Sequence, residues 1–133
     1  DHSHSLEGHS DADVLLHAVT DAILGAAAMG DIGELFPDTD PQNKMRDSGE
    51  MLKTALAKVT GAGFRINNID CIIFAQKPKL SPVKREIAKR IAEILEIAPD
   101  QVGVKAKTGE GVGTVGLHEV IMAECVVLLC KTV

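Results

Sequence analysis

Apolar and polar residues form two kinds of pattern along this chain, and the first kind is helical. Over residues 11–29, apolar side chains recur every three or four positions, at Val14, Leu15, Ala18, Val19, Ala22, Ile23 and Ala26. This spacing gives one apolar face to a helix that Ser10 or Asp11 can cap and Gly30 can end. Similar patterns predict a second helix over Ser48–Thr60 and a third from Pro82 to about Ile97.

The second pattern consists of short apolar runs rich in β-branched residues, which are typical of strands. These runs cover Ile69–Gln76, Val102–Lys107 and about Val120–Leu129. Asp31–Asn43 is rich in Asp, Gly and Pro, and it predicts an ordered loop with one helical turn. The order of elements predicts an α/β (α+β) fold, with helices packed on one face of a small mixed sheet. We expect residues 1–133 to form a single domain that lacks an N-terminal strand or hairpin.

The composition of the chain argues against two classes of function, membrane binding and nucleic-acid binding. The chain has 133 residues, of which 45% are hydrophobic and 25% charged, enough for one hydrophobic core. No apolar run reaches the roughly 20 residues that cross a bilayer, so we expect no membrane partner. The net charge of −5, with three Phe and no Tyr or Trp, argues against nucleic-acid binding.

The three cysteines are Cys71, Cys125 and Cys130, and each lies in an apolar, strand-like run. Their spacing matches neither a zinc ribbon nor a CxxC redox pair. The favoured interpretation is reduced core cysteines in a reducing compartment.

The first helix carries an unusual polar stripe. Asp13, His17 and Asp21 are four residues apart, so they share one side of the helix. A neutral imidazole is a good zinc ligand and a neighbouring carboxylate can orient it, although the stripe could equally face solvent. One histidine does not complete a zinc site. Gly8–Asp11, just ahead of the expected helix, could bind phosphate or could simply cap the helix.

Two loops could carry further chemistry. The carboxylates of Asp31–Asp40 could hold polyol hydroxyls or a metal through water, but Asp and Pro also build ordinary turns. Lys105, Lys107, Thr108 and Glu110 lead into a glycine-rich stretch. Lysines, a hydroxyl and close backbone approach suit a diphosphate, and Glu110 could bind Mg²⁺ or Mn²⁺. This stretch is neither a Walker nor a Rossmann fingerprint.

Four blocks in this order resemble the 2-C-methyl-D-erythritol 2,4-cyclodiphosphate synthase family. They are GHSDADVLLH (8–17), GDIGELFPDTD (30–40), AQKPK (75–79) and VKAKTGE (104–110). The resemblance implies a homotrimer with active sites at the subunit junctions. It implies a lyase of the non-mevalonate isoprenoid pathway that acts on 4-diphosphocytidyl-2-C-methyl-D-erythritol 2-phosphate. The 2-phosphate would attack the β-phosphorus, forming the cyclic diphosphate and releasing CMP. An isoprenoid phosphate could occupy the trimer cavity.

The resemblance also implies two metal ions. His17 matches a zinc ligand, with Asp13 and Asp21 supporting it from the same helix. Glu110 matches the ligand of a second divalent ion, Mg²⁺ or Mn²⁺, between the α- and β-phosphates.

The remaining implied roles are catalytic and substrate-binding. His9 and Thr108 match the pair that stabilises the transition state. The implied substrate contacts are Ser10, Asp31, Ile32, Gly33, Phe36, Pro37, Asp38, Thr39, Asp40, Ala75, Gln76, Lys77, Pro78, Lys79, Leu80, Ser81, Ala106, Lys107 and Glu110. Of these, residues 75–81 match the cytidine pocket and the loop of residues 31–40 matches the erythritol pocket.

The chain departs from the family pattern in two places. The family's Asp-x-His zinc motif does not stand ahead of His9, so we expect the native chain to begin some tens of residues earlier. Thr114 and Leu117 replace a usual aromatic and arginine. Two alternatives are a metal-dependent phosphohydrolase of nucleotide-linked polyols and an impaired trimeric protein that binds isoprenoid phosphates. A bacterial cytoplasm is the preferred compartment, and a plastid is also compatible.

Overall fold

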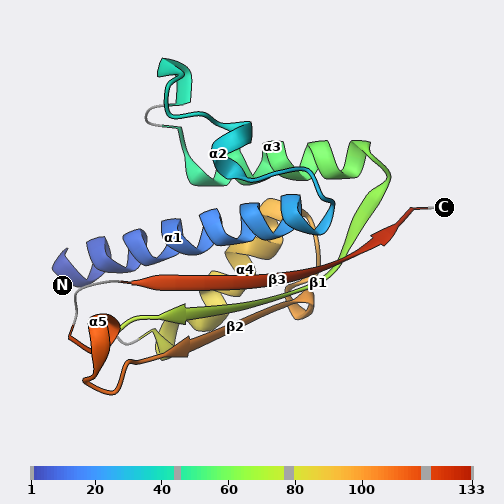
Figure 1. The fold of residues 1–133 in the computed structure, drawn as a ribbon. Coiled ribbons are helices and arrows are strands. Elements are labelled where there is room, and N and C mark those ends of the chain that lie inside the picture. Colours follow the sequence, from blue (N-terminus) through green and yellow to red (C-terminus); the bar gives the residue numbers. More distant parts are fainter. Residues whose placement is uncertain (1, 44–45, 77–79, 118–120, 133) are drawn as a thin grey trace.

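The computed structural model describes residues 2–43, 46–76, 80–117 and 121–132, and for residues 2–12 it describes the backbone alone. Three longer helices and three strands make up most of this part of the chain (Figure 1). The helices are α1 (His2–Ala26), α3 (Ser48–Gly61) and α4 (Lys84–Leu95). The strands are β1 (Phe64–Phe74), β2 (Val102–Lys107) and β3 (Met122–Lys131).

The sheet is mixed, as the order of elements predicts. Its strand order is β2-β1-β3, with β2 parallel and β3 antiparallel to the central β1. Strand β1 begins at Phe64, whereas the sequence predicted a start at Ile69. The added segment has only two apolar residues, Phe64 and Ile66, too few for the sequence to predict a strand, but its backbone pairs with the end of β3, with Phe64 opposite Lys131.

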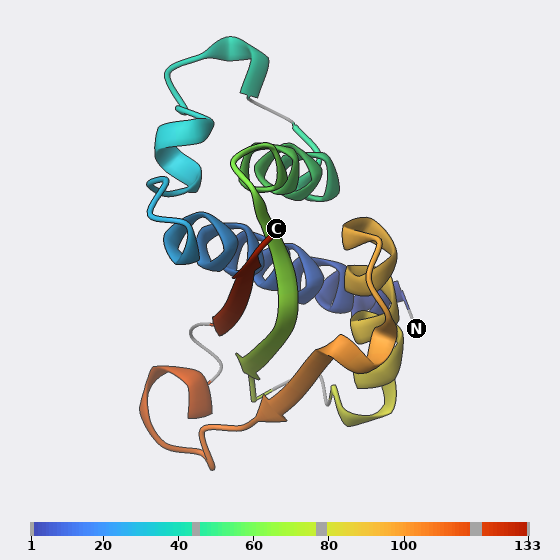
Figure 2. The same ribbon diagram turned by 90° about the vertical axis from the view of Figure 1, so that its right-hand side faces the viewer.

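The helices cover one face of this sheet. Helix α1 packs on β3 and on α3, and α4 packs on β2, so that the helices form a layer beside the strands (Figures 1 and 2). Alternate residues of β1, namely Ile69, Cys71 and Ile73, are buried in the core. They pack with Leu15, Val19, Ile23, Leu52, Val59 and Ile91, all fully or almost fully buried. The predicted helix-on-sheet arrangement is therefore confirmed.

The other face of the sheet carries apolar side chains that no described element covers. Met122, Val126 and Leu128 of β3 are 47%, 71% and 56% exposed. The strand register places Met122 opposite Phe74 and Val126 opposite Asp70 on β1. Because successive side chains alternate between faces, these residues form one surface, which we call the open sheet face.

Helix α1 begins at His2 rather than at Asp11, so the predicted start was wrong. Residues 2–10 contain no proline and a single glycine, Gly8, so nothing in them stops the helix from continuing toward the N-terminus. Ser10 and Asp11 consequently lie within α1 rather than at its N-cap, and phosphate binding at Gly8–Asp11 stays a prediction. Helix α1 ends at Ala26, and Ala28 and Gly30 then take positive φ angles of 56° and 86°.

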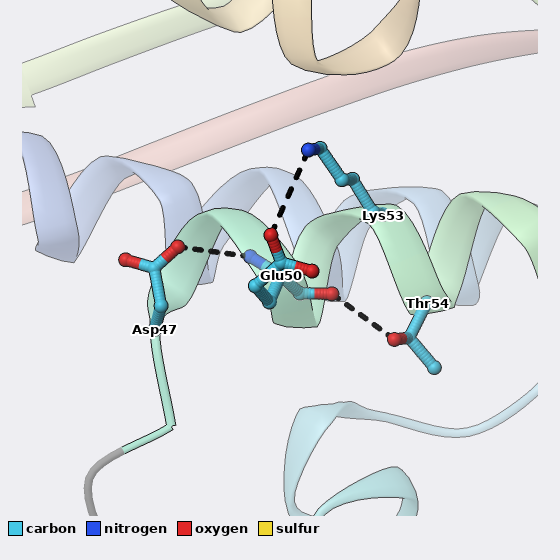
Figure 3. A network of polar contacts seen from close by, with 4 residues as sticks. All are labelled: Asp47, Glu50, Lys53 and Thr54. Carbon is cyan, nitrogen blue, oxygen red and sulfur yellow. Dashed lines mark hydrogen bonds and ion pairs between the residues drawn. The ribbon is translucent and has the colours of Figure 1, made fainter.

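Helix α3 starts at Ser48, as predicted, because Asp47 caps it. The Asp47 carboxylate accepts a hydrogen bond of 3.2 Å from the Glu50 backbone N–H (Figure 3). Lys53 lies 3.6 Å from the Glu50 carboxylate, and the Thr54 hydroxyl donates to the Glu50 carbonyl at 3.0 Å. These contacts fix the first turn of α3 and with it the position of Ser48.

The short elements are α2 (Ile32–Leu35), α5 (Gly113–Gly116) and the 3₁₀ turns η1 (Pro41–Asn43), η2 (Ser81–Val83) and η3 (Pro99–Gln101). Helical turns inside the Asp-rich loop were predicted, but α5 was not, because glycines disfavour helix. Pro82 lies in η2, so α4 begins two residues later than predicted, at Lys84. Helix α4 ends at Leu95 because Glu96 adopts the left-handed conformation, with φ 56°. Within the described residues, no helix combines the length and apolar character needed to cross a membrane.

Candidate active site

His17 lies on the exposed side of α1, where the start of α3 approaches it. Its Nε2 atom is 3.0 Å from the Ser48 hydroxyl. The Asp47 cap places Ser48 at this point, so the contact orients the imidazole ring through the fold. Sequence reasoning missed Ser48, because a serine at a helix start is read as ordinary helix chemistry.

Asp21 is one helical turn further along α1 and holds the Asp-rich loop. Its Oδ1 atom accepts a 2.7 Å hydrogen bond from the Ile32 backbone N–H. The carboxylate therefore joins α1 to the start of α2. The predicted role of Asp13 and Asp21 in supporting a metal at His17 stays a prediction, and Asp13 itself is half-buried on the same helix.

The loop of residues 31–40 is built largely by its own turn chemistry. Asp31 caps α2 by accepting from the Glu34 N–H at 2.8 Å, and Asp40 accepts from the Gln42 N–H at 3.0 Å. Phe36 is buried and anchors the loop, with the Arg46 guanidinium 5.0 Å from its ring centroid. The Pro37 carbonyl accepts a 2.7 Å hydrogen bond from the Asn43 side chain, which holds this part of the loop in place. The predicted polyol contacts Gly33, Asp38 and Thr39 remain exposed to solvent.

A second group of predicted residues gathers where β1 and β2 end. The Ala75 N–H donates to the Lys107 carbonyl at 3.0 Å, which extends the strand pairing by one residue. The Gln76 Oε1 atom then accepts from the N–H groups of Gly109, at 3.1 Å, and Gly111, at 3.5 Å. The Thr108 hydroxyl accepts from the Glu110 N–H at 3.2 Å, and the Thr108 and Glu110 side chains are exposed.

Other residues that were predicted to contact the substrate near this end of the sheet differ in their exposure to solvent. Lys107 and Ser81 are exposed, Ala106 is half-buried, and Leu80 and Ala75 are buried in the core. Lys77, Pro78 and Lys79 lie outside the described residues. The side chains of His9 and Ser10 are also outside the described part, which places only their backbone, in α1.

The two groups of residues lie on opposite sides of the molecule. In both views the loop that carries α2 is beyond α3, whereas the segment that leads to α5 is at the far side of the strands (Figures 1 and 2). A single copy of the chain therefore does not bring the Asp-rich loop and the glycine-rich loop together. Across the described residues, no group of three or more His, Cys, Asp or Glu side chains is placed to hold a metal ion.

The cysteines are free thiols, as predicted. Cys71 and Cys125 face each other across β1 and β3, with their sulfur atoms 3.5 Å apart. The hydrogen bond with Cys71, burial and the nearby Asp70 raise the pKa of the Cys125 thiol well above its usual range. This pair belongs to the core and lies apart from both groups of site residues.

A mixed sheet with helices on one face, an Asp-rich loop and a glycine-rich loop next to Lys107 and Thr108 defines a small α/β protein. The model of the YgbB family matches residues 1–130, and the chain therefore belongs to the YgbB family. The predicted resemblance is confirmed.

Curated relatives are similar over most of their length. A 2-C-methyl-D-erythritol 2,4-cyclodiphosphate synthase of Bordetella avium is 54% identical over 98% of this chain and 81% of its own. A protein of the same name from Rhodopirellula baltica is 54% identical over 93% of this chain and 75% of its own.

Solved structures confirm the fold. The CDP complex of IspF from Plasmodium falciparum has a TM-score of 0.80 and 32% identity, and the match covers 90% of this chain and 72% of that one. The bifunctional IspDF of Campylobacter jejuni has a TM-score of 0.85 and 45% identity over 89% of this chain and 32% of that one.

Proposed function

We propose that this chain is a cyclase that converts 4-diphosphocytidyl-2-C-methyl-D-erythritol 2-phosphate to 2-C-methyl-D-erythritol 2,4-cyclodiphosphate with release of CMP. The observation that carries the proposal is the identity of 54% over 98% of the chain to a relative with this activity in its name. The similarity to an IspF structure that holds CDP supports a cytidine-nucleotide-linked substrate.

The reaction needs no nucleophile from the protein. An oxygen of the 2-phosphate attacks the β-phosphorus, and a new P–O bond forms. The bond from that phosphorus to the bridging oxygen breaks, and CMP leaves with the electron pair. The protein contributes positioning and charge neutralisation, which dominate catalysis of phosphoryl transfer.

The roles of individual residues are part of this proposal. The loop of residues 31–40 would hold the erythritol hydroxyls through Asp38, Thr39 and its backbone. The segment of residues 75–81 would recognise the cytosine by hydrogen bonds from its backbone groups. Lys107 and the Thr108 hydroxyl would face the diphosphate, and His9 would act with Thr108 in the transition state. The exposure of Thr108 and Lys107 at one end of β2 supports this assignment.

Metal binding also belongs to the proposal. The imidazole of His17, oriented by Ser48, suits a Zn²⁺ ligand, and Glu110 suits a hard cation such as Mg²⁺ or Mn²⁺. His17 alone does not complete a zinc site, so further ligands must come from outside the described residues or from another subunit. When bound, such ions would neutralise negative charge on the phosphates.

We further propose a homotrimer with its sites between subunits. The Asp-rich loop and the glycine-rich loop of one copy lie on opposite sides of the molecule, so a site that uses both requires two copies. The open sheet face, with Val126 and Leu128 exposed, offers an apolar surface for association. An isoprenoid phosphate in the trimer interior and a bacterial cytoplasmic location stay predictions.

The decisive experiment measures CMP release from the diphosphocytidyl substrate with Zn²⁺ and Mg²⁺. It uses the assembled protein, and we expect CMP to be released together with the cyclic diphosphate. Linear phosphate products would favour a phosphohydrolase instead, and substrate binding without CMP release would favour a binding protein.

A matched set of threonine variants tests the site assignment in the same assay. Thr108→Val should lower kcat by about a hundredfold, because it removes a donor aimed at the reacting phosphate. Thr108→Ser keeps the hydroxyl and should retain most activity. Thr54→Val is the control, because the Thr54 hydroxyl bonds the Glu50 carbonyl of its own helix. Equal activity of Thr108→Val and wild type would remove Thr108 from the catalytic group.

A further inference from the structure

The Gln76 side chain joins two segments that are distant in sequence. It lies two residues after the end of β1, and its Oε1 atom accepts from two backbone N–H groups of the loop after β2, those of Gly109 and Gly111. The adjacent Ala75–Lys107 hydrogen bond places both segments at the same end of the sheet. Both segments belong to the proposed nucleotide site, the first on its cytidine side and the second on its diphosphate side.

The loop that Gln76 holds has little freedom because its glycines touch one another. A Cβ atom on Gly109 would overlap the backbone of Gly116, and a Cβ atom on Gly116 would overlap the backbone of Gly111. Between them, Glu110 has φ 54°, a left-handed conformation that is strained for a non-glycine residue. The Gly109 and Gly111 hydrogen bonds flank this strained residue and can offset its cost.

The Glu110 side chain depends on this arrangement. The Glu110 backbone N–H donates to the Thr108 hydroxyl, so the two residues are held in a fixed relative position. If the Gln76 acceptor is lost, two N–H groups lose their partner and Glu110 can relax to a right-handed conformation. That change would turn both side chains away from their present directions.

We propose that Gln76 is a positioning residue, which fixes the Thr108–Glu110 segment against the cytidine-side segment so that base and diphosphate are held in one geometry. The inference rests on the proposed cyclase function. It changes the expectation that Gln76 contacts the substrate, because its oxygen is already used within the protein. Gln76 then holds the cytidine side and the diphosphate side of the proposed site in a fixed relative position.

The test compares Gln76→Leu, which removes the acceptor at similar size, with Gln76→Glu, which keeps two acceptor oxygens. Gln101→Leu is the matched control. Gln101 also accepts a backbone N–H, that of Ala98 at 2.9 Å, and donates to the Asn67 carbonyl at 2.9 Å, away from the loop. Amide hydrogen exchange of residues 108–112 measures loop order, and calorimetry with CDP and with cytidine measures binding, all with the assembled full chain.

We expect Gln76→Leu to speed exchange of residues 108–112 and to weaken CDP binding by about tenfold, with little change for cytidine. Gln76→Glu should restore slow exchange, and Gln101→Leu should alter neither CDP binding nor this exchange. The proposal is overturned if Gln76→Leu leaves exchange unchanged, or if cytidine and CDP weaken equally, which would indicate direct base contact. If the wild-type protein binds no CDP, the proposed function fails, and exchange alone then shows whether Gln76 orders the loop.

Discussion

At the scale of single residues, Asp21 shows how a polar side chain on a helix can hold a loop that is distant in sequence. The sequence predicts that this carboxylate supports a metal. The structure gives it a partner eleven residues along the chain, the Ile32 N–H, at 2.7 Å. The loop that carries Asp31–Asp40 is therefore held by α1.

Removing this carboxylate should loosen the loop. We expect Asp21→Ala to lower the free energy of unfolding by about 1–2 kcal/mol, because a charge-assisted hydrogen bond is lost. Asp21→Asn keeps the Oδ1 acceptor and should cost less than half of this. Urea unfolding followed by circular dichroism measures both variants. Equal stability of Asp21→Ala and wild type would show that the contact contributes nothing in solution.

The Cys125 thiol predicts a pH dependence of stability. Its pKa is raised in the folded state, whereas a thiol in the unfolded chain ionises near pH 8.5. Below about pH 8.5 both states hold the proton and the contribution to stability is complete. Above it the unfolded state loses the proton first, so stability falls by at most about 1.4 kcal/mol per pH unit.

The measurement is urea unfolding of wild type and Cys125→Ala between pH 7 and pH 10. Groups distant from Cys125 titrate alike in both proteins, so the difference between them reports on this thiol and its contact with Cys71. We expect the advantage of wild type to shrink as the pH rises. A constant difference would contradict the raised pKa.

At the scale of elements, two helical glycines differ in the space around their Cα atoms. Gly25 lies in α1, and nothing is within 4 Å of the point where a Cβ atom would stand, whereas Gly116 in α5 packs against the Gly111 backbone. Gly25→Ala should therefore raise the free energy of unfolding by about 0.5–1 kcal/mol, because alanine favours helix. Urea unfolding of this variant beside wild type measures the gain.

Gly116→Ala should have the opposite effect, because its new methyl group overlaps the loop that holds Glu110. We expect a lower melting temperature, faster exchange of residues 108–112 and weaker CDP binding. Gly25→Ala serves as the matched control and should leave CDP binding unchanged. If Gly116→Ala binds CDP like wild type, the close packing of this loop is not required by the site.

At the scale of the whole molecule, the open sheet face should control assembly. Val126→Glu places a charge on a side chain that is 71% exposed in a single chain, so it should preserve the fold but prevent association. Ala57→Glu, at an exposed position of α3, is the control. Sedimentation velocity measures the oligomeric state, and CMP release measures activity. A trimeric, active Val126→Glu protein would place the subunit contact on another face.

How much of this protein could be read from its sequence depends on the range of the interactions. Helical spacing and β-branched runs act locally, so they located α3 and β2 well and established the mixed sheet with one helical layer. The blocks GHSDADVLLH and GDIGELFPDTD also led to the family, which the comparisons confirm. The start of α1 was missed, because a polar stretch without proline carries no stop signal, and so was α5, because only tertiary contacts stabilise it.

The sequence by itself determined the type of each major element and the family. Those properties follow from side-chain periodicity and from residue types at fixed spacing. Only the tertiary structure decided that Ser48 meets His17, that Asp21 holds Ile32, and that Gln76 binds the Gly109 and Gly111 amides. These partners are distant in sequence, and their hydrogen bonds depend on how helices and strands pack, which no local pattern specifies.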